Sequence, residues 1–477
     1  MKAQGVLPFS VEPDRADEKI TSFAGLPLVA ETFRALGLPQ TIRTHLKLKE
    51  RQAGYTEAQM VESFVLLFAA GGDCFEDIEV LSADPGLKAL VGVSRFPSPE
   101  AMRFFTYAFH DEEKIEEAKT NRPPDAIAYI PEETPALRAL EEVSATVVRR
   151  VQGHSPSKTA TLDVDATIIE ANKEEALRTY EGDKGYQPLV GLWAEQNLIV
   201  ADEFRDGNVP AGWRGKAFIA RCIRNLPAGV EAFFLRSDSA LYDHEVMEFC
   251  KDAEANGIGR EILFAISADM TPELRAKAET LPEGAWRALP GVRETDPTPG
   301  RKQWAEVEFI PGKPGEKKTL RPDRYLLIRV SPVQRELFSD GRRHHYFAVV
   351  TNRWREAGDE VIRWHRGKAG TIEIAHDVVK NDLGGSVMPC GRFGANAAWF
   401  RLNVLTHNVL QAMKKAALPP AMGTMRLKAL RFRLLRAAGK VIHTGRQMIL
   451  KIAERLEAYA LLVEARPQLV AAFALSP

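Results

Sequence analysis

The chain has 477 residues, and its 64 Lys and Arg residues balance 64 Asp and Glu residues, so the overall charge points to no particular partner. A hydrophobic content of 45% and a charged content of 27% are ordinary for a globular protein of about two to four domains. The four cysteines lie far apart and form no CxxC pair, which excludes the common zinc and redox motifs and predicts a reduced, cytoplasmic compartment.

Charge is unevenly distributed along the chain. Acidic residues dominate the first 150 residues, whereas between residues 414 and 457 only Glu454 and Glu457 oppose the basic residues. These basic residues are Lys414, Lys415, Arg426, Lys428, Arg431, Arg433, Arg436, Lys440, Arg446, Lys451 and Arg455. Their concentration predicts a polyanionic partner, although the solvated face of an amphipathic helix explains part of it. No apolar run approaches the ~20 residues of a membrane helix, and the amino terminus lacks a signal-peptide pattern, so we expect no membrane partner.

Residues 1–153 have the apolar spacing of helices and are predicted to form a helical amino-terminal domain. The expected helices cover residues 25–36, 57–70, 99–110 and 136–148. Ser98 is placed to cap the third of them, and the proline-rich stretch 120–135 is expected to be a connector. This domain either binds DNA or serves only for packing, because its residues show no recognisable chemistry.

Residues 154–283 alternate between strand and helix patterns. The expected order is a meander of three strands followed by helix, strand, helix, strand and helix, at 160–169, 189–194, 198–204, 216–225, 230–236, 242–255, 262–267 and 272–280. This order predicts an α/β fold of the ribonuclease-H-like type, in which helices flank a mixed sheet.

The pattern changes again after residue 283. Residues 284–358 are predicted to form a β-rich insertion with turns rich in proline and glycine. Residues 359–394 are predicted to complete the α/β domain with a helix that runs from about Asp359 past Leu383. Residues 395–477 are expected to be a basic, helical carboxyl-terminal region.

Two aspartates interrupt the apolar strand 160–169. Because strand side chains alternate between faces, Asp163 and Asp165 share one face, and the apolar residues around them point to the other. Two like charges side by side are costly to bury unless a cation or a set of donors compensates them. The strand therefore predicts half of a metal site, and the alternative is the solvated face of an edge strand.

Two later acids could complete such a site. Asp238 follows a predicted strand, and ligands collect at the carboxyl ends of strands in sheets with crossover helices. Its alternative role is to cap the next helix. Glu373 shares a helix face with Lys380 and follows Arg366 and Lys368, for which a surface salt-bridge face is the alternative.

Together these motifs resemble the DDE insertion-sequence transposases of the cut-and-paste group that carry a Tyr-Arg-Glu-Lys signature. The shared features are an acidic strand with Asp-x-Thr, a strand ending in Asp-Ser, a β insertion, and a helix in which Lys follows Glu by seven residues. The similarity spans about residues 155–460. The positions of the signature Tyr and Arg are occupied here by Arg366 and Ala369, so half of the signature is present.

The resemblance implies which residues perform the reaction. By motif position, Asp165, Asp238 and Glu373 would be the catalytic and metal-binding acids, with Asp163 open as an alternative ligand to Asp165. They would hold two Mg²⁺ ions, with Mn²⁺ as a substitute, because hard cations prefer oxygen ligands. Two such ions can activate the attacking oxygen and stabilise the leaving oxygen at a phosphodiester.

The same resemblance implies the substrate and the partners. The protein would cut DNA at the ends of an insertion element and join the freed 3′-hydroxyl to target DNA. Its partners would be double-stranded DNA with terminal inverted repeats, target DNA and a second copy of the chain in a synaptic complex, in the cytoplasm at the nucleoid. Phosphates would be bound by Arg366, Lys368, Lys380, Arg431, Arg433 and Arg436. Trp304 is a candidate for stacking on a flipped base, and a core tryptophan is the alternative.

Two other functions fit parts of the sequence. The motif Leu162-Asp-Val-Asp-Ala-Thr167 also matches the DxDxT motif of haloacid-dehalogenase-type phosphatases, with Asp163 as nucleophile and Asp165 as acid and base. That function leaves Glu373 without a role, and no later strand ends in a convincing acidic pair. The third possibility is a catalytically inactive DNA-binding protein derived from a transposase.

Overall fold

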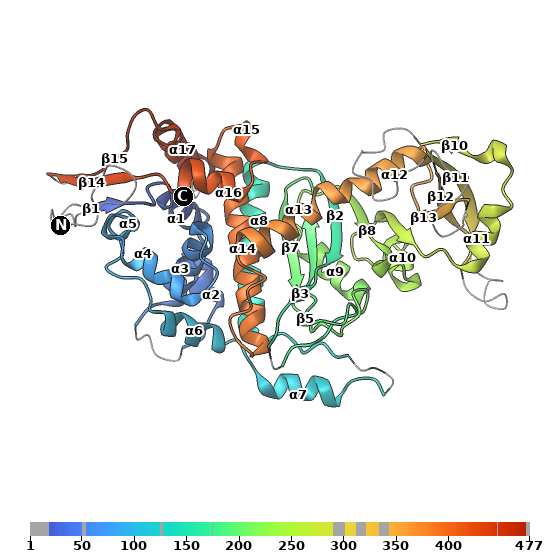
Figure 1. Ribbon diagram of the computed structural model, residues 1–477, viewed down its shortest axis with the longest axis horizontal. Coiled ribbons are helices and arrows are strands. Elements are labelled where there is room, and N and C mark those ends of the chain that lie inside the picture. The colour runs from blue at the N-terminus through green and yellow to red at the C-terminus, as the bar shows by residue number, and fades with distance from the viewer. Residues whose placement is uncertain are drawn as a thin grey trace, which may run out of the picture.

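A computed structural model of the chain describes residues 19–49, 54–124, 126, 128–173, 175–289, 301–311, 321–332, 343–445 and 447–473. Three regions follow one another along the long axis in Figure 1: a helical region, a central sheet with its helices, and the β-rich insertion. Among the described residues, no helix has both the length and the apolar content that crossing a membrane requires.

The amino-terminal region is helical, as predicted. Its helices are α1 (Pro27–Ala35), α2 (Leu38–His45), α3 (Glu57–Ala70), α4 (Ile78–Ser82), α5 (Pro85–Val91), α6 (Pro99–Tyr107), α7 (Glu112–Thr120) and α8 (Pro135–His154). Helix α3 begins with a capping box, in which the Thr56 side chain accepts from the Gln59 backbone N–H and the Gln59 side chain accepts from that of Thr56. Ser98 caps α6 as predicted, since its hydroxyl oxygen accepts from the Ala101 backbone N–H at 3.2 Å.

The central sheet has the predicted ribonuclease-H-like strand order. Strand β2 (Thr159–Ala166) pairs in antiparallel fashion with β6 (Leu189–Trp193), which is followed by β7 (Leu198–Glu203). On its other side β2 runs parallel to β8 (Ala232–Ser237), and β8 runs parallel to β9 (Leu263–Ala268). The helices between these strands are α9 (Gly215–Asn225) and α10 (His244–Lys251), and α11 (Pro272–Glu279) follows β9. A small second sheet consists of β3 (Ile169–Glu170), β5 (Lys184–Tyr186) and β4 (Leu177–Arg178).

The β-rich insertion extends the central sheet. Its strands are β10 (Arg287–Ala288), β11 (Arg301–Phe309), β12 (Asp323–Ser331) and β13 (His345–Thr351). Strand β13 pairs in antiparallel fashion with β9, so the described strands form one nine-stranded sheet in the order β10-β11-β12-β13-β9-β8-β2-β6-β7. The insertion therefore shares its hydrogen-bond ladder with the strands that precede it in the chain.

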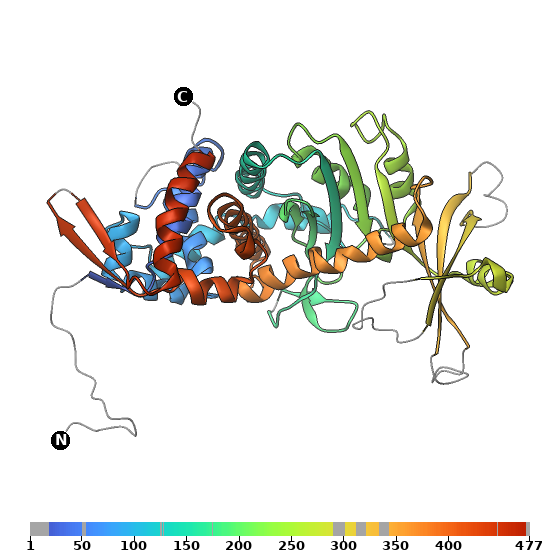
Figure 2. The ribbon, with the colours of Figure 1, turned by 90° about the horizontal axis from the view of Figure 1, so that it is seen from above.

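The chain then returns along the sheet toward the helical region. Helices α12 (Gly358–Arg366) and α13 (Ile372–Asp377) lead from the insertion past β2, and the long helix α14 (Phe393–Ala417) follows (Figure 2). Between α12 and α13, residues 367–370 form a 3₁₀ turn. The predicted helical stretch from about Asp359 is therefore present, but this turn divides it into separate helices.

The last part of the chain is less helical than predicted. Short helices α15 (Pro420–Gly423) and α16 (Leu427–Leu430) precede a β-hairpin of β14 (Gly439–Thr444) and β15 (Gln447–Lys451), and α17 (Glu457–Phe473) ends the described chain. Strand β14 also pairs with β1 (Lys19–Thr21). The prediction of a helical region over 395–477 is thus wrong at the hairpin, which forms its sheet with a strand distant in sequence.

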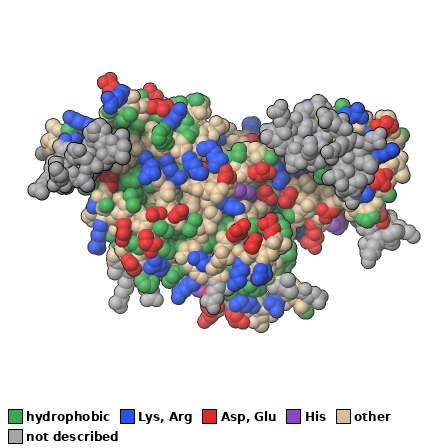
Figure 3. Space-filling view, in the orientation of Figure 1, with side chains coloured by type: hydrophobic (Ala, Val, Ile, Leu, Met, Phe, Trp, Pro, Cys, Tyr) green, Lys and Arg blue, Asp and Glu red, His purple; other side chains and the backbone are tan. Residues whose placement is uncertain are grey.

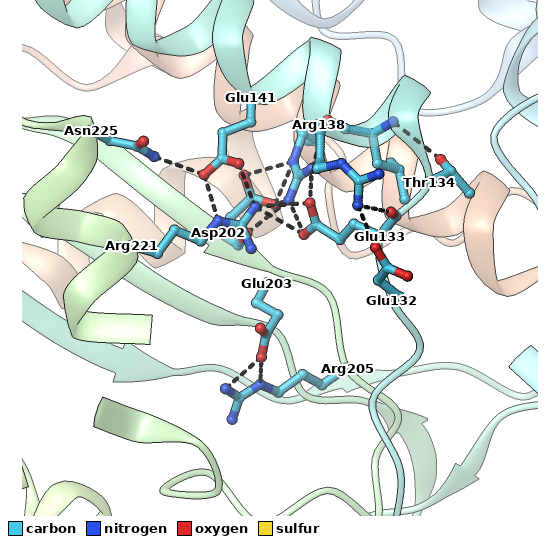
Figure 4. A network of polar contacts seen from close by, with 12 residues as sticks. Glu132, Glu133, Thr134, Arg138, Glu141, Asp202, Glu203, Arg205, Arg221 and Asn225 are labelled. Carbon is cyan, nitrogen blue, oxygen red and sulfur yellow. Dashed lines mark hydrogen bonds and ion pairs between the residues drawn. The ribbon is translucent and has the colours of Figure 1, made fainter. Parts of the chain in front are cut away.

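Helix α14 is buried around almost its whole circumference. Buried charges fix it to the sheet, and Figure 4 shows the polar network to which its partners Glu133 and Asp202 belong. Arg401 of α14 donates to both carboxylate oxygens of Asp202 on β7 at 3.1 Å, and to Glu133 at 2.8 and 3.0 Å. Glu133 also binds Arg221 of α9, which contacts Glu141 of α8. Burial alone would raise the pKa of Glu133, but the two guanidinium groups lower it to about 2.

Candidate active site

The first two candidate acids stand at the same edge of the sheet. Asp165 lies at the carboxyl end of β2, and Asp238 follows directly after the end of the parallel strand β8. Asp238 also has its alternative role, because its carboxylate accepts from the Ala240 backbone N–H at 3.0 Å and caps a 3₁₀ turn. Both side chains are partly buried. Asp238 can therefore cap the turn and still lie beside Asp165 as a candidate metal ligand.

Glu373 enters the same neighbourhood from the returning helices. It lies in the first turn of α13, where its side chain is exposed. Burial raises the pKa of Asp165 to about 6, the Lys368 ammonium opposes that rise, and the charges of Asp238 and Glu373 add to it. Lys368 Nζ lies 3.7 Å from Asp165 Oδ2. The three acids therefore share one electrostatic environment that contains a single close lysine.

The carboxylate oxygens of the three acids are nevertheless too far apart for all three to share one metal ion in this structure. Within the part of the chain that the structure describes, one group of His, Cys, Asp and Glu residues has ligand atoms all within 4.8 Å of each other: Asp73, Cys74 and Asp77. That group belongs to the loop after α3 in the helical region. The candidate acids would have to change side-chain rotamers to share an ion.

Asp163 has a different environment from Asp165. Its carboxylate is fully buried and accepts two hydrogen bonds from Arg236, from Nε at 2.6 Å and from Nη2 at 2.8 Å. The Thr371 hydroxyl donates to the same carboxylate. Strand β2 lies inside the sheet and is buried on both faces, so the alternative of a solvated edge-strand face is wrong. The carboxylate of Asp163 is thus paired with the guanidinium of Arg236, a residue that was not predicted from the sequence.

The turn between α12 and α13 is shaped by the same guanidinium. Arg236 Nη1 donates to the Trp364 carbonyl oxygen at 2.8 Å, and the guanidinium carbon lies 5.2 Å from the centre of the Trp364 ring. A Cβ atom at Gly367 would lie 2.8 Å from Arg236 Nη1, so this position requires glycine for the close approach. Next to it, His365 is buried, with its Nε2 atom 2.9 Å from the Ser237 carbonyl oxygen.

The basic residues predicted near the site occupy different positions. Lys368, one residue before the family's arginine position, is the cation beside Asp165. Lys380 donates to the Ile168 carbonyl oxygen just beyond β2, and burial lowers its pKa. Arg366 is partly buried at the end of α12. Two of the three therefore contact residues at or near the end of β2.

The arginines near the carboxyl end divide into two kinds. Arg431 donates to the backbone oxygens of Phe68 and Ala69 at the end of α3 and to that of Asp382. Its donors therefore cap backbone oxygens in this structure, and its contact with DNA stays a prediction. Arg433 and Arg436 are exposed. Lys and Arg side chains form a row over the region of α16 on the face shown in Figure 3.

Trp304 belongs to the core of the insertion. Its side chain is 4% exposed and packs in a cluster with Leu326, Ile328 and Val361. An added Cβ at Gly358 would lie 2.2 Å from its ring, which shows how closely α12 covers it. The structure favours the core role over the predicted stacking on a flipped base, because no base could reach this ring without unpacking α12.

Sequence reasoning missed Arg236 and Thr371. A usable signal was present for Arg236, because it stands two residues before Asp238 in a strand and so shares its face. The partner could not be found from the sequence, since it depends on the register in which Asp163 of β2 lies opposite Arg236 of β8. Thr371 lies in the helix break, which apolar periodicity did not reveal.

The fold and the site define a class: a ribonuclease-H-like domain with acidic side chains gathered where its central parallel strands end. The sequence matches the family described as "Transposase DDE domain group 1" over residues 9–472. The chain belongs to this transposase family. Among solved structures, the piggyBac transposase synaptic complex with hairpin DNA is similar at 11% sequence identity and a TM-score of 0.42, covering 83% of this chain and 76% of that chain. No curated protein matches the chain.

Proposed function

We propose that this transposase cuts phosphodiester bonds at the ends of its insertion element and joins the freed 3′-hydroxyl to target DNA. In this proposal Asp165, Asp238 and Glu373 hold divalent cations, Mg²⁺ by preference and Mn²⁺ as a substitute. The observation that carries the proposal is the position of partly buried Asp165 at the end of β2, where the charges of the other two acids act on it. Membership of the family supports the same reaction.

The donor set fits such ions by its chemistry. It consists of carboxylate oxygens, which hard divalent cations prefer, whereas histidine or cysteine would favour zinc. Burial raises the pKa of Asp165, and repulsion by Asp238 and Glu373 adds to the rise, although the ammonium of Lys368 opposes it. A bound cation would relieve this excess of negative charge. When bound, two divalent cations would activate the attacking oxygen and stabilise the leaving oxygen of an in-line displacement.

The protein's own residues would orient the reacting groups. Lys368 lies close enough to Asp165 to hold a phosphate oxygen of the scissile bond beside the acids. The hydrogen bond of Lys380 to the Ile168 carbonyl oxygen fixes the chain that leaves β2. In the first step water attacks phosphorus, the bond from phosphorus to the 3′-oxygen breaks, and a 3′-hydroxyl and a 5′-phosphate are formed. In the second step the oxygen of that 3′-hydroxyl attacks a phosphorus of target DNA, the bond from this phosphorus to the target's 3′-oxygen breaks, and the proton of the attacking hydroxyl ends on the target's 3′-hydroxyl.

Double-stranded DNA is the proposed partner, both as terminal repeats and as target. Exposed Arg433 and Arg436, together with Lys428, would contact phosphates from the region of α16. A second copy of the chain would bring the two element ends together, since both ends must be joined to one target. Acting on DNA would place the protein at the nucleoid.

The phosphatase alternative is not favoured. Its nucleophile would be Asp163, but both carboxylate oxygens of this residue accept hydrogen bonds from Arg236 in the interior. A buried carboxylate held in this way is inaccessible to a small substrate. An inactive DNA-binding protein remains the competing outcome of the experiment.

The test is incubation of the purified protein with Mg²⁺ and a duplex that carries the inverted repeats flanking its coding region. The wild type should nick this duplex, whereas Asp165→Asn, Asp238→Asn and Glu373→Gln should lose at least about 100-fold in rate. Full activity of Glu373→Gln would contradict the three-acid site. Specific binding of the duplex by a wild type that does not cleave it would support the inactive protein.

A further inference from the structure

Asp163, Arg236 and Thr371 form a triad next to the proposed active site, in which the first two are buried and Thr371 is partly buried. Asp163, Arg236 and Thr371 each stand two residues before one of the candidate acids, Asp165, Asp238 and Glu373 respectively. On a strand, residues two apart share a face, so Asp163 and Asp165 lie on one face of β2. Arg236 lies on β8, two residues before Asp238, which follows the end of that strand. The three segments that supply the acids therefore contact one another through these three side chains.

Each side chain of the triad contacts the other two. Arg236 donates to Asp163 through Nε at 2.6 Å and through Nη2 at 2.8 Å, and its Nη2 lies 3.4 Å from Thr371 Oγ1. The Thr371 hydroxyl donates to Asp163 Oδ2. A planar guanidinium fixes direction as well as distance when it binds a carboxylate with two parallel hydrogen bonds. Each member thus contacts the other two.

The triad is also tied to the turn that aims α13. Arg236 Nη1 donates to the Trp364 carbonyl oxygen at 2.8 Å, and the Thr371 backbone N–H donates to the Lys368 carbonyl oxygen at 3.0 Å. Between these two points the backbone makes the 3₁₀ turn that carries Lys368. A shift of Arg236 would therefore move Lys368 and the start of α13 relative to β2.

We propose that Asp163, Arg236 and Thr371 form a positioning triad, which sets the distances between the three acids of the active site. The inference rests on the proposed function, because it assigns these residues to the geometry of that metal site. Packing alone does not require such an arrangement, since a buried ion pair is often no more stabilising than apolar residues of similar size. A set of contacts that joins all three acid-bearing segments explains why charge is retained here.

Thr371 offers the mildest test, because Val has nearly the same shape without the hydroxyl and Ser keeps the hydroxyl without the methyl group. The full-length protein is titrated with Mn²⁺ alone, and bound ion is followed by the electron paramagnetic resonance of free Mn²⁺. Thr371→Val should weaken Mn²⁺ binding about tenfold or more, as loss of a residue that orients ligands does, while Thr371→Ser retains most of it. Thermal unfolding is measured on the same samples.

The matched control is Thr406→Val on α14, which removes another buried hydroxyl that donates to a backbone oxygen, at 2.8 Å to Leu402. It should leave Mn²⁺ binding unchanged. Equal Mn²⁺ affinity in Thr371→Val and wild type would overturn the positioning triad while leaving the proposed function intact. A wild type that neither binds Mn²⁺ nor cleaves DNA would instead overturn the proposed function, and this inference with it.

A second variant guards against misfolding, since Arg236→Met alone leaves a buried, unpaired carboxylate. The combination Asp163→Leu, Arg236→Met replaces the pair by apolar side chains and should fold. It should still lose Mn²⁺ affinity by about tenfold or more. If it folds and binds Mn²⁺ as the wild type does, the triad is structural only and the inference is wrong.

Discussion

Asp163 and Asp165 are two residues apart on β2, and their carboxylates have different surroundings. The carboxylate of Asp163 is compensated by Arg236 and by the hydroxyl of Thr371. The carboxylate of Asp165 has a raised pKa, because burial and two neighbouring acids outweigh the nearby ammonium of Lys368. The charge of Asp163 is therefore paired in the interior, whereas ionised Asp165 opposes the folded state. A cost of this kind is typical of functional sites.

Amide substitutions separate these two aspartates. In the absence of divalent cations, Asp163→Asn should lower the free energy of unfolding at pH 7 by about 3–5 kcal/mol, because it leaves the charge of Arg236 buried and unpaired. Asp165→Asn should raise that free energy, since it removes a destabilising charge. Urea denaturation monitored by circular dichroism measures both. A destabilising Asp165→Asn would contradict the electrostatic description of the site.

The residue scale also shows what the sequence could predict. Asp165, Asp238 and Glu373 were identified because each lies at an element end or on a helix face that can be recognised from local patterns. Arg236 was missed, because pairing it with Asp163 requires knowing which strands are neighbours and in which register. Burial was equally hidden, and it alone distinguishes the core residue Trp304 from a stacking residue.

At the scale of elements, helix ends determine where the basic side chains go. Helix α3 ends at Ala70, where the last carbonyl groups lack intrahelical partners. Arg431 supplies donors to two of these oxygens, at Phe68 and Ala69. Arg433, two residues later, is exposed and has one long ion pair, at 3.9 Å from Glu457. Of these two neighbouring arginines, Arg431 thus has a structural role, and Arg433 presents its charge at the surface.

These two arginines give a matched pair of variants. Arg431→Met should lower the free energy of unfolding by about 1–3 kcal/mol, because buried carbonyl groups lose charged donors, and should leave the salt dependence of DNA binding unchanged. Arg433→Met should leave stability nearly unchanged and reduce the slope of log affinity against log salt by about 1. Fluorescence anisotropy with labelled duplex measures the slope. An unchanged slope for Arg433→Met would exclude that residue from the DNA interface.

At the scale of the whole molecule, strands that lie far apart in the sequence pair with one another. Strand β1 pairs with β14, more than 400 residues later in the chain, and β13 of the insertion pairs with β9. Local patterns predicted the strands of the central sheet well, together with α1, α3, α6 and α8 of the first region. They did not predict α2, α4, α5 and α7. They missed the hairpin of β14 and β15, because its stability depends on pairing with a distant strand. The boundaries of the predicted domains remain predictions.

The ion network around Arg401 connects α8, the sheet and α14, so it should control the stability of the whole chain. Glu133→Gln should lower the free energy of unfolding at pH 7 by about 3–5 kcal/mol, since Arg401 and Arg221 lose a buried partner. The pKa of Glu133 is lowered to about 2, below its value in the unfolded chain. Its contribution is therefore fully present above about pH 4.5 and is lost as the pH falls toward 2.

The measurement is urea denaturation of wild type and Glu133→Gln between pH 7 and pH 3. The difference between the two should shrink as the pH falls. Glu132→Gln is the control, because Glu132 is the adjacent acid and its side chain is mostly exposed, and it should have little effect at any pH. A difference that grows toward acidic pH would contradict the lowered pKa.

The central claim is that the three acids bind the cations that the reaction needs, and metal-specificity rescue tests it most directly. Asp165→Cys, Asp238→Cys and Glu373→Cys are assayed for cleavage of terminal-repeat DNA with Mg²⁺ and with Mn²⁺. A thiolate is a poor ligand for Mg²⁺ and a better one for softer ions. We expect each variant to be inactive with Mg²⁺ and to recover part of the wild-type rate with Mn²⁺. Cleavage by any of them at the wild-type rate in Mg²⁺ would contradict the three-acid metal site.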